Sequence, residues 1–238
     1  MKVFENFIIQ NSQLGENLNS IRLICNSLCL NGCITTLILS SNSLLEKAEN
    51  ISLFSEVFNK NPINDLTICS DKFDKKGESM RILCDSLKNN KTLTQLDLSD
   101  TKNIQNMEYL TSMLETNTII SHLDLSNCSL GNNFPNVMNL SKIIENNCFI
   151  KVLNLQGNDL FRDKENTKIF CSSLKKTQIQ KISFYSNKIE SNIQNIELFV
   201  DLGKFLASNH KEIKIDIGRL ENKTLIDKLS CFDKYFEL

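Results

Sequence analysis

The chain has 238 residues, of which 41% are hydrophobic and 23% are charged, a composition typical of a globular protein rather than a disordered one. Its 27 basic and 28 acidic residues give a formal net charge of −1, so no basic excess points to nucleic acid or to an anionic membrane. No apolar run of about 18 residues predicts a membrane span, and the first residues lack a secretory hydrophobic stretch. The nine cysteines are an odd number, which excludes a complete disulfide framework and predicts reduced thiols in a cytosolic setting.

A short apolar motif recurs along the whole chain. Its clearest copies lie at 96–99, 123–130 and 153–160, where Leu-x-Leu is followed by a polar turn. The copies begin at Phe7, Leu37, Leu66, Leu96, Leu123, Leu153, Ile182 and Ile215. Their intervals run from 27 residues (96 to 123) to 33 residues (182 to 215). The alternating apolar residues predict a short strand in each of eight roughly equal units.

The segments between these strands repeat as well. An apolar residue recurs nine positions before the strand, an Asn six positions before it, and a second apolar residue three positions before it. Leu83 with Leu87, and Leu110 with Leu114, follow helical spacing. Each unit therefore predicts a strand, a turn and an amphipathic helix that leads to the next strand.

These units resemble the leucine-rich repeat family, specifically its ribonuclease-inhibitor-like subclass. The family motif Leu-x-x-Leu-x-Leu-x-x-Asn/Cys-x-Leu is matched around 123–130 and 153–160, and the resemblance covers nearly the whole chain. It implies an α/β solenoid shaped like a horseshoe, with about eight units, a concave parallel sheet and convex helices, formed by residues 1–238 as a single domain. It also implies that the Asn or Cys after each strand turns inward and satisfies backbone groups at the turn.

Two units depart from the motif. Asp71 and Thr101 stand where the turn Asn is expected, and residues 101–106 contain a local insertion. We expect a distorted turn there.

The end of the chain breaks the period. Leu225, Ile226, Leu229, Phe232 and Phe236 lie at helical spacings, which predicts a helix over about 223–236. The simple interpretation is that 219–238 forms a C-terminal capping helix, since terminal repeats must shield the core. The same stripe fits a docking helix for a partner or a secretion signal. At the other end, the sequence leaves open whether the N-terminal edge pairs with another chain.

Residues suited to chemistry are few. His122 and His210 belong to no paired-His motif. Cys25, Cys29 and Cys33 are spaced by four, which invites a zinc interpretation, but two of them fall in a helix of the repeat, so buried structural thiols are the better hypothesis. The seven glycines form no phosphate-binding loop. We therefore predict no catalytic residue, no metal site and no cofactor.

What remains is the concave face of the sheet, where residues flanking the inward leucines form columns across the strands. The middle of this face is acidic and polar, and one end is basic and aromatic. The candidate partner-binding residues are Asp65, Gln95, Asp97, His122, Asp124, Asn154, Lys181 and Tyr185. The alternative is that these residues are merely solvated.

The resemblance implies a non-catalytic module that binds a partner protein through the concave face and rim loops. We expect a monomer that binds neither nucleic acid nor membranes and is cytoplasmic, or an effector secreted into a host cytosol. The alternative is a GTPase-activating protein resembling the leucine-rich activators of Ran, with Arg162 as the rim arginine, although that family's acidic C-terminal tail is missing. A third hypothesis is an enzyme built on cysteine or zinc.

Overall fold

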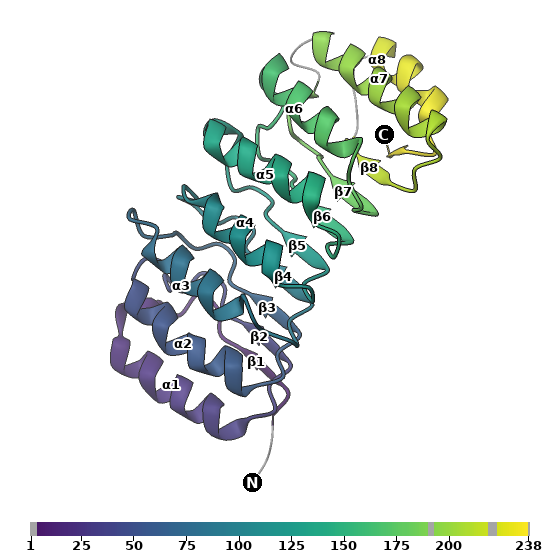
Figure 1. The fold of residues 1–238 in the computed structure, drawn as a ribbon. Helices are drawn as coiled ribbons and strands as arrows, with labels where there is room; N and C mark the ends of the chain where they lie inside the picture. The colour runs from purple at the N-terminus through teal and green to yellow at the C-terminus, as the bar shows by residue number, and fades with distance from the viewer. Residues whose placement is uncertain (1–3, 190–192, 219–222, 238) are drawn as a thin grey trace. The chain divides into compact units, whose positions relative to one another are not determined.

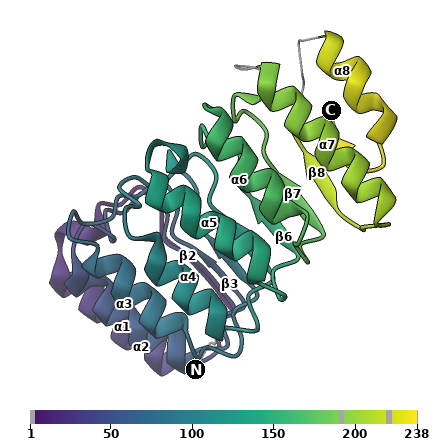
Figure 2. The ribbon, with the colours of Figure 1, turned by 45° about the horizontal axis from the view of Figure 1, so that its top comes forward.

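The computed structural model describes residues 4–189, 193–218 and 223–237. The chain forms two compact units, Met1–Asp124 and Leu125–Leu238, which we call unit 1 and unit 2. Parallel strands alternate with helices along the chain in both units, so the predicted α/β strand–helix repeat is confirmed. Within each unit the helices between residues 18 and 208 lie along one side of the strands (Figure 1, Figure 2).

The described part of unit 1 contains five strands, each hydrogen-bonded in parallel to the next along the chain. Its elements are β1 (Asn6–Ile8), α1 (Leu18–Asn31), β2 (Thr36–Ile38), α2 (Ala48–Lys60), β3 (Asp65–Thr67), α3 (Glu78–Leu87), β4 (Gln95–Asp97), α4 (Met107–Thr116) and β5 (His122–Asp124). The helices α1 to α4 pack against one another in sequence order. β1 is the edge strand of this unit.

The described part of unit 2 contains four parallel strands in chain order. Its elements are α5 (Phe134–Asn146), β6 (Val152–Asn154), α6 (Lys164–Leu174), β7 (Lys181–Ser183), α7 (Ile193–Ser208), β8 (Lys214–Asp216), α8 (Lys223–Leu229) and β9 (Phe236–Glu237). Short 3₁₀ turns at Leu130–Asn132 and Ser230–Phe232 complete the unit. α8 packs beside α7 (Figure 2).

The strand register follows the repeat predicted from the sequence. In unit 1 the central residues Phe7, Leu37, Leu66, Leu96 and Leu123 pair across neighbouring strands. In unit 2 the central residues are Leu153, Ile182, Ile215 and Phe236. All except Phe7 are buried, because their side chains point to the helix side. Each leucine or isoleucine removed from water in this way contributes about 1.5–3 kcal/mol to folding.

The helices are amphipathic, as their spacing predicts. The apolar residues nine positions before each strand, Leu28, Val57, Leu87, Leu114, Ile144 and Leu206, are all buried. An Asn at the end of several helices joins successive repeats. The Asn117 amide Nδ2 donates to the Leu87 carbonyl at 2.8 Å, and its Oδ1 accepts from the Ile120 N–H at 3.0 Å. A buried side chain thus satisfies backbone groups that the helix end leaves open.

The turns after β2, β6 and β7 are organised by a second buried Asn, as the resemblance implies. These residues are Asn42, Asn158 and Asn187. In unit 2, Asn158 Oδ1 accepts from the N–H groups of Cys128 at 3.0 Å and Leu130 at 3.2 Å. Its Nδ2 donates to the carbonyls of Leu125 at 2.7 Å and Leu155 at 3.0 Å. One amide therefore ties two adjacent repeats together through four backbone groups.

Asp71 and Thr101 interrupt this ladder in unit 1. Asp71 is buried and accepts from the N–H groups of Leu44 at 2.8 Å and Lys72 at 2.7 Å, but a carboxylate cannot donate to the strand carbonyls. The expected distortion takes an ordered form, because the chain pairs once more beyond the turn through a parallel bridge between Lys72 and Lys102. The Lys102 N–H donates to the Asp71 carbonyl at 3.0 Å.

The C-terminal segment differs from the helix predicted over 223–236. α8 ends at Leu229, and residues 236–237 form β9 instead. The helical spacing was misleading because Phe236 also occupies the central column of the sheet, opposite Ile215, and strand pairing buries it there. A Cβ at Gly203 on α7 would lie 2.7 Å from the Phe232 ring, so this glycine leaves the space that the ring fills. Residues 219–222 and 238 of the predicted cap lie outside the described residues.

Candidate functional site

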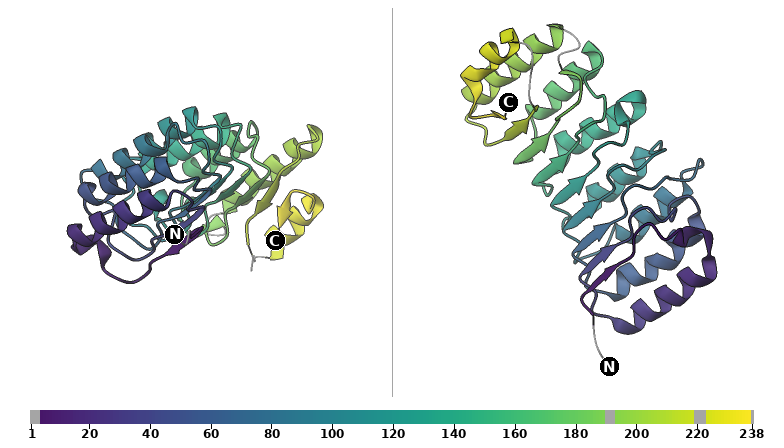
Figure 3. Two further views of the ribbon diagram at one scale, coloured as in Figure 1. Left: turned by 90° about the horizontal axis from the view of Figure 1, so that it is seen from below. Right: turned by 180° about the vertical axis from the view of Figure 1, so that it is seen from behind.

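Five of the candidate residues come together on unit 1. Asp65, Gln95 and His122 form one column, and Asp97 and Asp124 form the next column two positions along the strands. We call these five residues the acidic strip. Because strand side chains alternate, they point to the side opposite the buried leucines, where Figure 3 shows no helix over the strands of unit 1. All five are half-buried or exposed.

Like charges are adjacent in the acidic strip. Asp97 and Asp124 are direct partners on neighbouring parallel strands. Partial burial and the nearby Asp97 carboxylate raise the pKa of Asp65 above its ordinary value. Within the described residues, neither Asp65 nor Asp97 forms an ion pair, although Asp97 Oδ1 accepts from the Ser99 N–H at 2.8 Å. The strip therefore concentrates negative charge, and no basic side chain among the described residues forms an ion pair with Asp65 or Asp97.

The imidazole of His122 borders the acidic strip. Its Nδ1 lies 3.0 Å from the Ser121 hydroxyl, and the side chain is exposed. Among residues 4–189, 193–218 and 223–237, no three His, Cys, Asp or Glu side chains are grouped so as to hold a metal ion. None of the helices in these ranges is both long and apolar enough to cross a bilayer.

The other three candidate residues lie on unit 2. Asn154 is on β6, where its Oδ1 accepts from the Gln156 N–H at 3.1 Å. Lys181 is on β7, and its Nζ forms an ion pair with Glu237 of β9 at 3.2 Å. Tyr185 follows β7, is exposed, and lies against Gly218, where a Cβ would lie 2.0 Å from the ring. The structure thus divides the candidate residues into a group of five on unit 1 and a group of three on unit 2.

Sequence reasoning missed the internal pairing on the unit 2 face. The Ser183 hydroxyl of β7 donates to Asp216 Oδ2 of β8 at 2.7 Å. On the same face, Lys181 of β7 forms its ion pair with Glu237 of β9. The sequence already placed Ser183 and Asp216 in one column, because they have the same register position on neighbouring strands. Glu237 was not placed in a column, since the expected helix over 223–236 hid the strand that carries it.

Arg162 and the cysteines complete the list of predicted chemistry. Arg162 lies just after the turn of unit 2, with a largely exposed side chain whose Nη2 donates to Asp159 Oδ2 at 3.1 Å. Cys25 is buried in α1, Cys29 is half-buried one turn further on, and Cys33 is exposed beyond the helix end at Gly32. Burial raises the pKa of the Cys25 thiol to about 12, which keeps it protonated and unreactive at neutral pH.

No protein-family model matches the chain, and no curated protein matches it.

Proposed function

We propose that the chain is a non-catalytic protein-interaction module of the ribonuclease-inhibitor-like leucine-rich repeat subclass, and that it binds a partner protein through the open face of its strands. The observation that carries the proposal is the acidic strip of unit 1. In it, Asp97 and Asp124 are held directly opposite each other on neighbouring strands. Like charges in that arrangement destabilise a sheet by a few tenths of a kcal/mol.

The charge of the strip indicates the chemistry of the partner. Three aspartates and one histidine on adjacent strands favour a surface that presents Lys or Arg side chains. Complementary charge of this kind mainly raises the association rate and selects against wrong partners. The rigid backbone ladder beneath the strip holds the carboxylates in place, so little side-chain ordering is required of the module on binding.

The test is affinity capture from eukaryotic cytosolic lysate, followed by titration of any captured protein against the purified chain. Asp97→Lys combined with Asp124→Lys reverses the charge of the strip. Glu108→Lys combined with Glu115→Lys makes the same change in charge on exposed positions of α4, on the helix side of the same unit. Circular dichroism would check that both double variants are folded.

We expect the wild type and the α4 variant to retain the partner and the strip variant to lose it. Raising the ionic strength to about 1 M, where the screening length falls to about 3 Å, should release the partner from the wild type. Equal retention by both double variants would contradict the proposal, because the binding surface would then lie elsewhere.

A further inference from the structure

The outer edge of unit 1 leaves large apolar side chains in water. Phe4 is 61% exposed, Ile8 58%, Leu23 68% and Leu30 78%. They account for half of the eight large hydrophobic residues that are exposed in the described part of the chain. Clustered exposure of this kind is rare on monomers and marks surfaces that are covered in the functional state.

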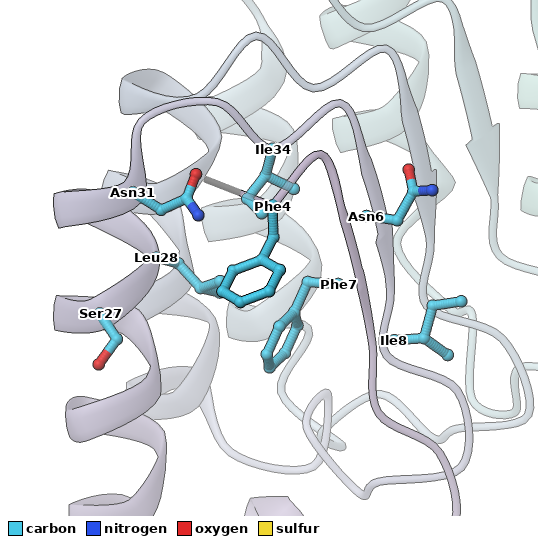
Figure 4. Close-up of a pocket in the computed structure, with 8 residues that line it drawn as sticks. All are labelled: Phe4, Asn6, Phe7, Ile8, Ser27, Leu28, Asn31 and Ile34. Carbon is cyan, nitrogen blue, oxygen red and sulfur yellow. The ribbon is translucent and has the colours of Figure 1, made fainter. Parts of the chain in front are cut away.

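The repeat explains why Phe4 is exposed. It lies three positions before Phe7, the central residue of β1, and the later repeats of unit 1 have Ile34, Ile63, Leu93 and Ile120 at the same position. Those four side chains are at most 1% exposed. Among residues 4–189, 193–218 and 223–237, no repeat packs outside β1 to cover Phe4 as a preceding repeat covers each of them. Phe4, Phe7 and Leu28 instead line an open cavity of about 560 Å³ on the helix side of β1, while Asn6 and Ile8 point to the other side of the strand (Figure 4).

The backbone of β1 is also unsatisfied on this edge. The Glu5 carbonyl accepts from the Thr36 N–H at 3.1 Å, and the Ile9 N–H donates to the Ile38 carbonyl at 2.9 Å. Odd-numbered residues of β1 therefore face β2. The alternation of a strand turns the N–H and C=O groups of Asn6 and Ile8 away from β2, toward the open edge. β1 is thus a template for one more strand.

The adjoining helix continues the same surface. Ser27 and Asn31 of α1 line the cavity, and Leu23 and Leu30 lie about one helical turn to either side of Ser27. Arg22 is the one charged residue among the fourteen of α1, and none of the eight residues that line the cavity is charged. The cavity lining therefore has no acidic side chain with which the basic partner expected for the acidic strip could form an ion pair.

We propose that the outer edge of unit 1 binds a second copy of the chain, with the two β1 strands pairing antiparallel about a two-fold axis. Two features select a copy of the same chain. The edge is self-complementary, because an axis through Phe7 sets Asn6 of each copy opposite Ile8 of the other, and both residues present the hydrogen-bonding groups that antiparallel pairing needs. The cavity lining is also uncharged, and among the described residues Glu5 and Arg22 are the charged residues nearest to it in the chain, so identical patches meet with little like-charge repulsion. Pairing would bring Phe4 and Phe7 of both copies to the same interface.

The test is the molar mass of the purified full chain over a concentration series, measured by light scattering and by sedimentation equilibrium. We expect the mass to rise with concentration from 27.2 kDa toward twice that value. Ile8→Lys introduces a charge on the exposed edge and should weaken the association at least about tenfold. Phe134→Lys is the matched control, since Phe134 is 53% exposed on α5 and lies in unit 2.

Asn6→Pro separates the backbone contribution from the apolar one. Proline removes the outward N–H of an edge strand without touching the bonds to β2, and should also weaken the association. Hydrogen exchange adds a local readout, because the amides of Asn6 and Ile8 should exchange more slowly at high concentration in the wild type only. A chain that stays at 27.2 kDa at every concentration would overturn the proposal, as would equal weakening by Ile8→Lys and Phe134→Lys.

Discussion

Units 1 and 2 are built from the same repeat but are completed differently. In unit 2, β9 pairs with the last repeat strand, Phe236 fills the central column, and the open face carries its own ion pair between Lys181 and Glu237. In unit 1, the edge strand β1 has no such cover, Phe4 is in water, and aspartates lie opposite each other on the open face. The same repeat is therefore covered at its outer edge strand in unit 2 and left uncovered at β1 in the described part of unit 1.

The largest expected effect tests the two outer edges. Phe236→Ala removes a ring that is 2% exposed and lies 6.2 Å from the Phe199 ring, so it should lower the free energy of unfolding by about 3–5 kcal/mol. Phe4→Ala removes a ring that is 61% exposed and should lower it by less than about 1 kcal/mol at concentrations where the chain is monomeric. Urea denaturation would measure both. Similar losses would show that the two edges are equally well packed.

A reciprocal exchange tests the two turn ladders. Burial raises the pKa of Asp71 above its ordinary value despite the N–H donors, with a smaller contribution from the Glu46 carboxylate. A carboxyl group whose pKa is raised by folding stabilises the fold below its unfolded pKa, near 3.9, and that contribution is lost as the pH rises through the folded pKa. Asp71→Asn should therefore stabilise the chain by about 1 kcal/mol at pH 7. The gain should shrink as the pH falls through the raised folded pKa of Asp71 and should be lost below about pH 4.

Asn158→Asp is the opposite exchange in unit 2. It removes the Nδ2 that donates to Leu125 and Leu155 and sets a carboxylate beside both carbonyls. We expect a loss of about 1–3 kcal/mol at pH 7 that becomes smaller in acid. Denaturant titrations at pH 7 and pH 4 would compare the two variants, and equal effects at both pH values would rule out the ionisation argument.

The smallest expected effects compare the two open faces. The Lys181 and Glu237 side chains are 51% and 43% exposed, so Lys181→Ala should cost no more than about 0.5 kcal/mol. Asp97→Asn should have the opposite sign and stabilise the chain by a few tenths of a kcal/mol, because it relieves repulsion with Asp124. Thermal unfolding at low and high salt would measure both, and both should fade at high salt. Destabilisation by Asp97→Asn at low salt would show that its bond from Ser99 outweighs the repulsion.

The period of the apolar residues predicted most of the fold. A leucine every 27 to 33 residues locates the strands, and the same alignment gives the register that unites Asp97 with Asp124. The prediction was wrong at the C-terminal end, where the period of the apolar residues is not kept. Phe236 follows Ile215 by 21 residues (215 to 236), which is too short for a repeat, so the sequence favoured a helix and hid the pairing of Glu237 with Lys181.

The open edge was only partly visible in the sequence. Phe4 shares its register position with Ile34, but the pattern marks both as core residues. Only the structure shows that Ile34 is buried and Phe4 is exposed to water, because burial depends on which neighbouring repeat is present. The ladder substitution at Asp71 was visible as a departure, whereas the compensating bridge between Lys72 and Lys102 depends on backbone geometry that side-chain patterns do not encode.

The two-residue strand β9 also limits how copies of this chain can assemble. If the edge of β8 were bare, β1 of another copy could add to it in parallel, head to tail, and each addition would expose a fresh β8 for open-ended growth into a filament. β9 occupies that edge, and it is too short to serve as a template itself. With β8 covered in this way, the pairing of β1 strands proposed above leaves no bare β8 edge to which a further copy could add in parallel.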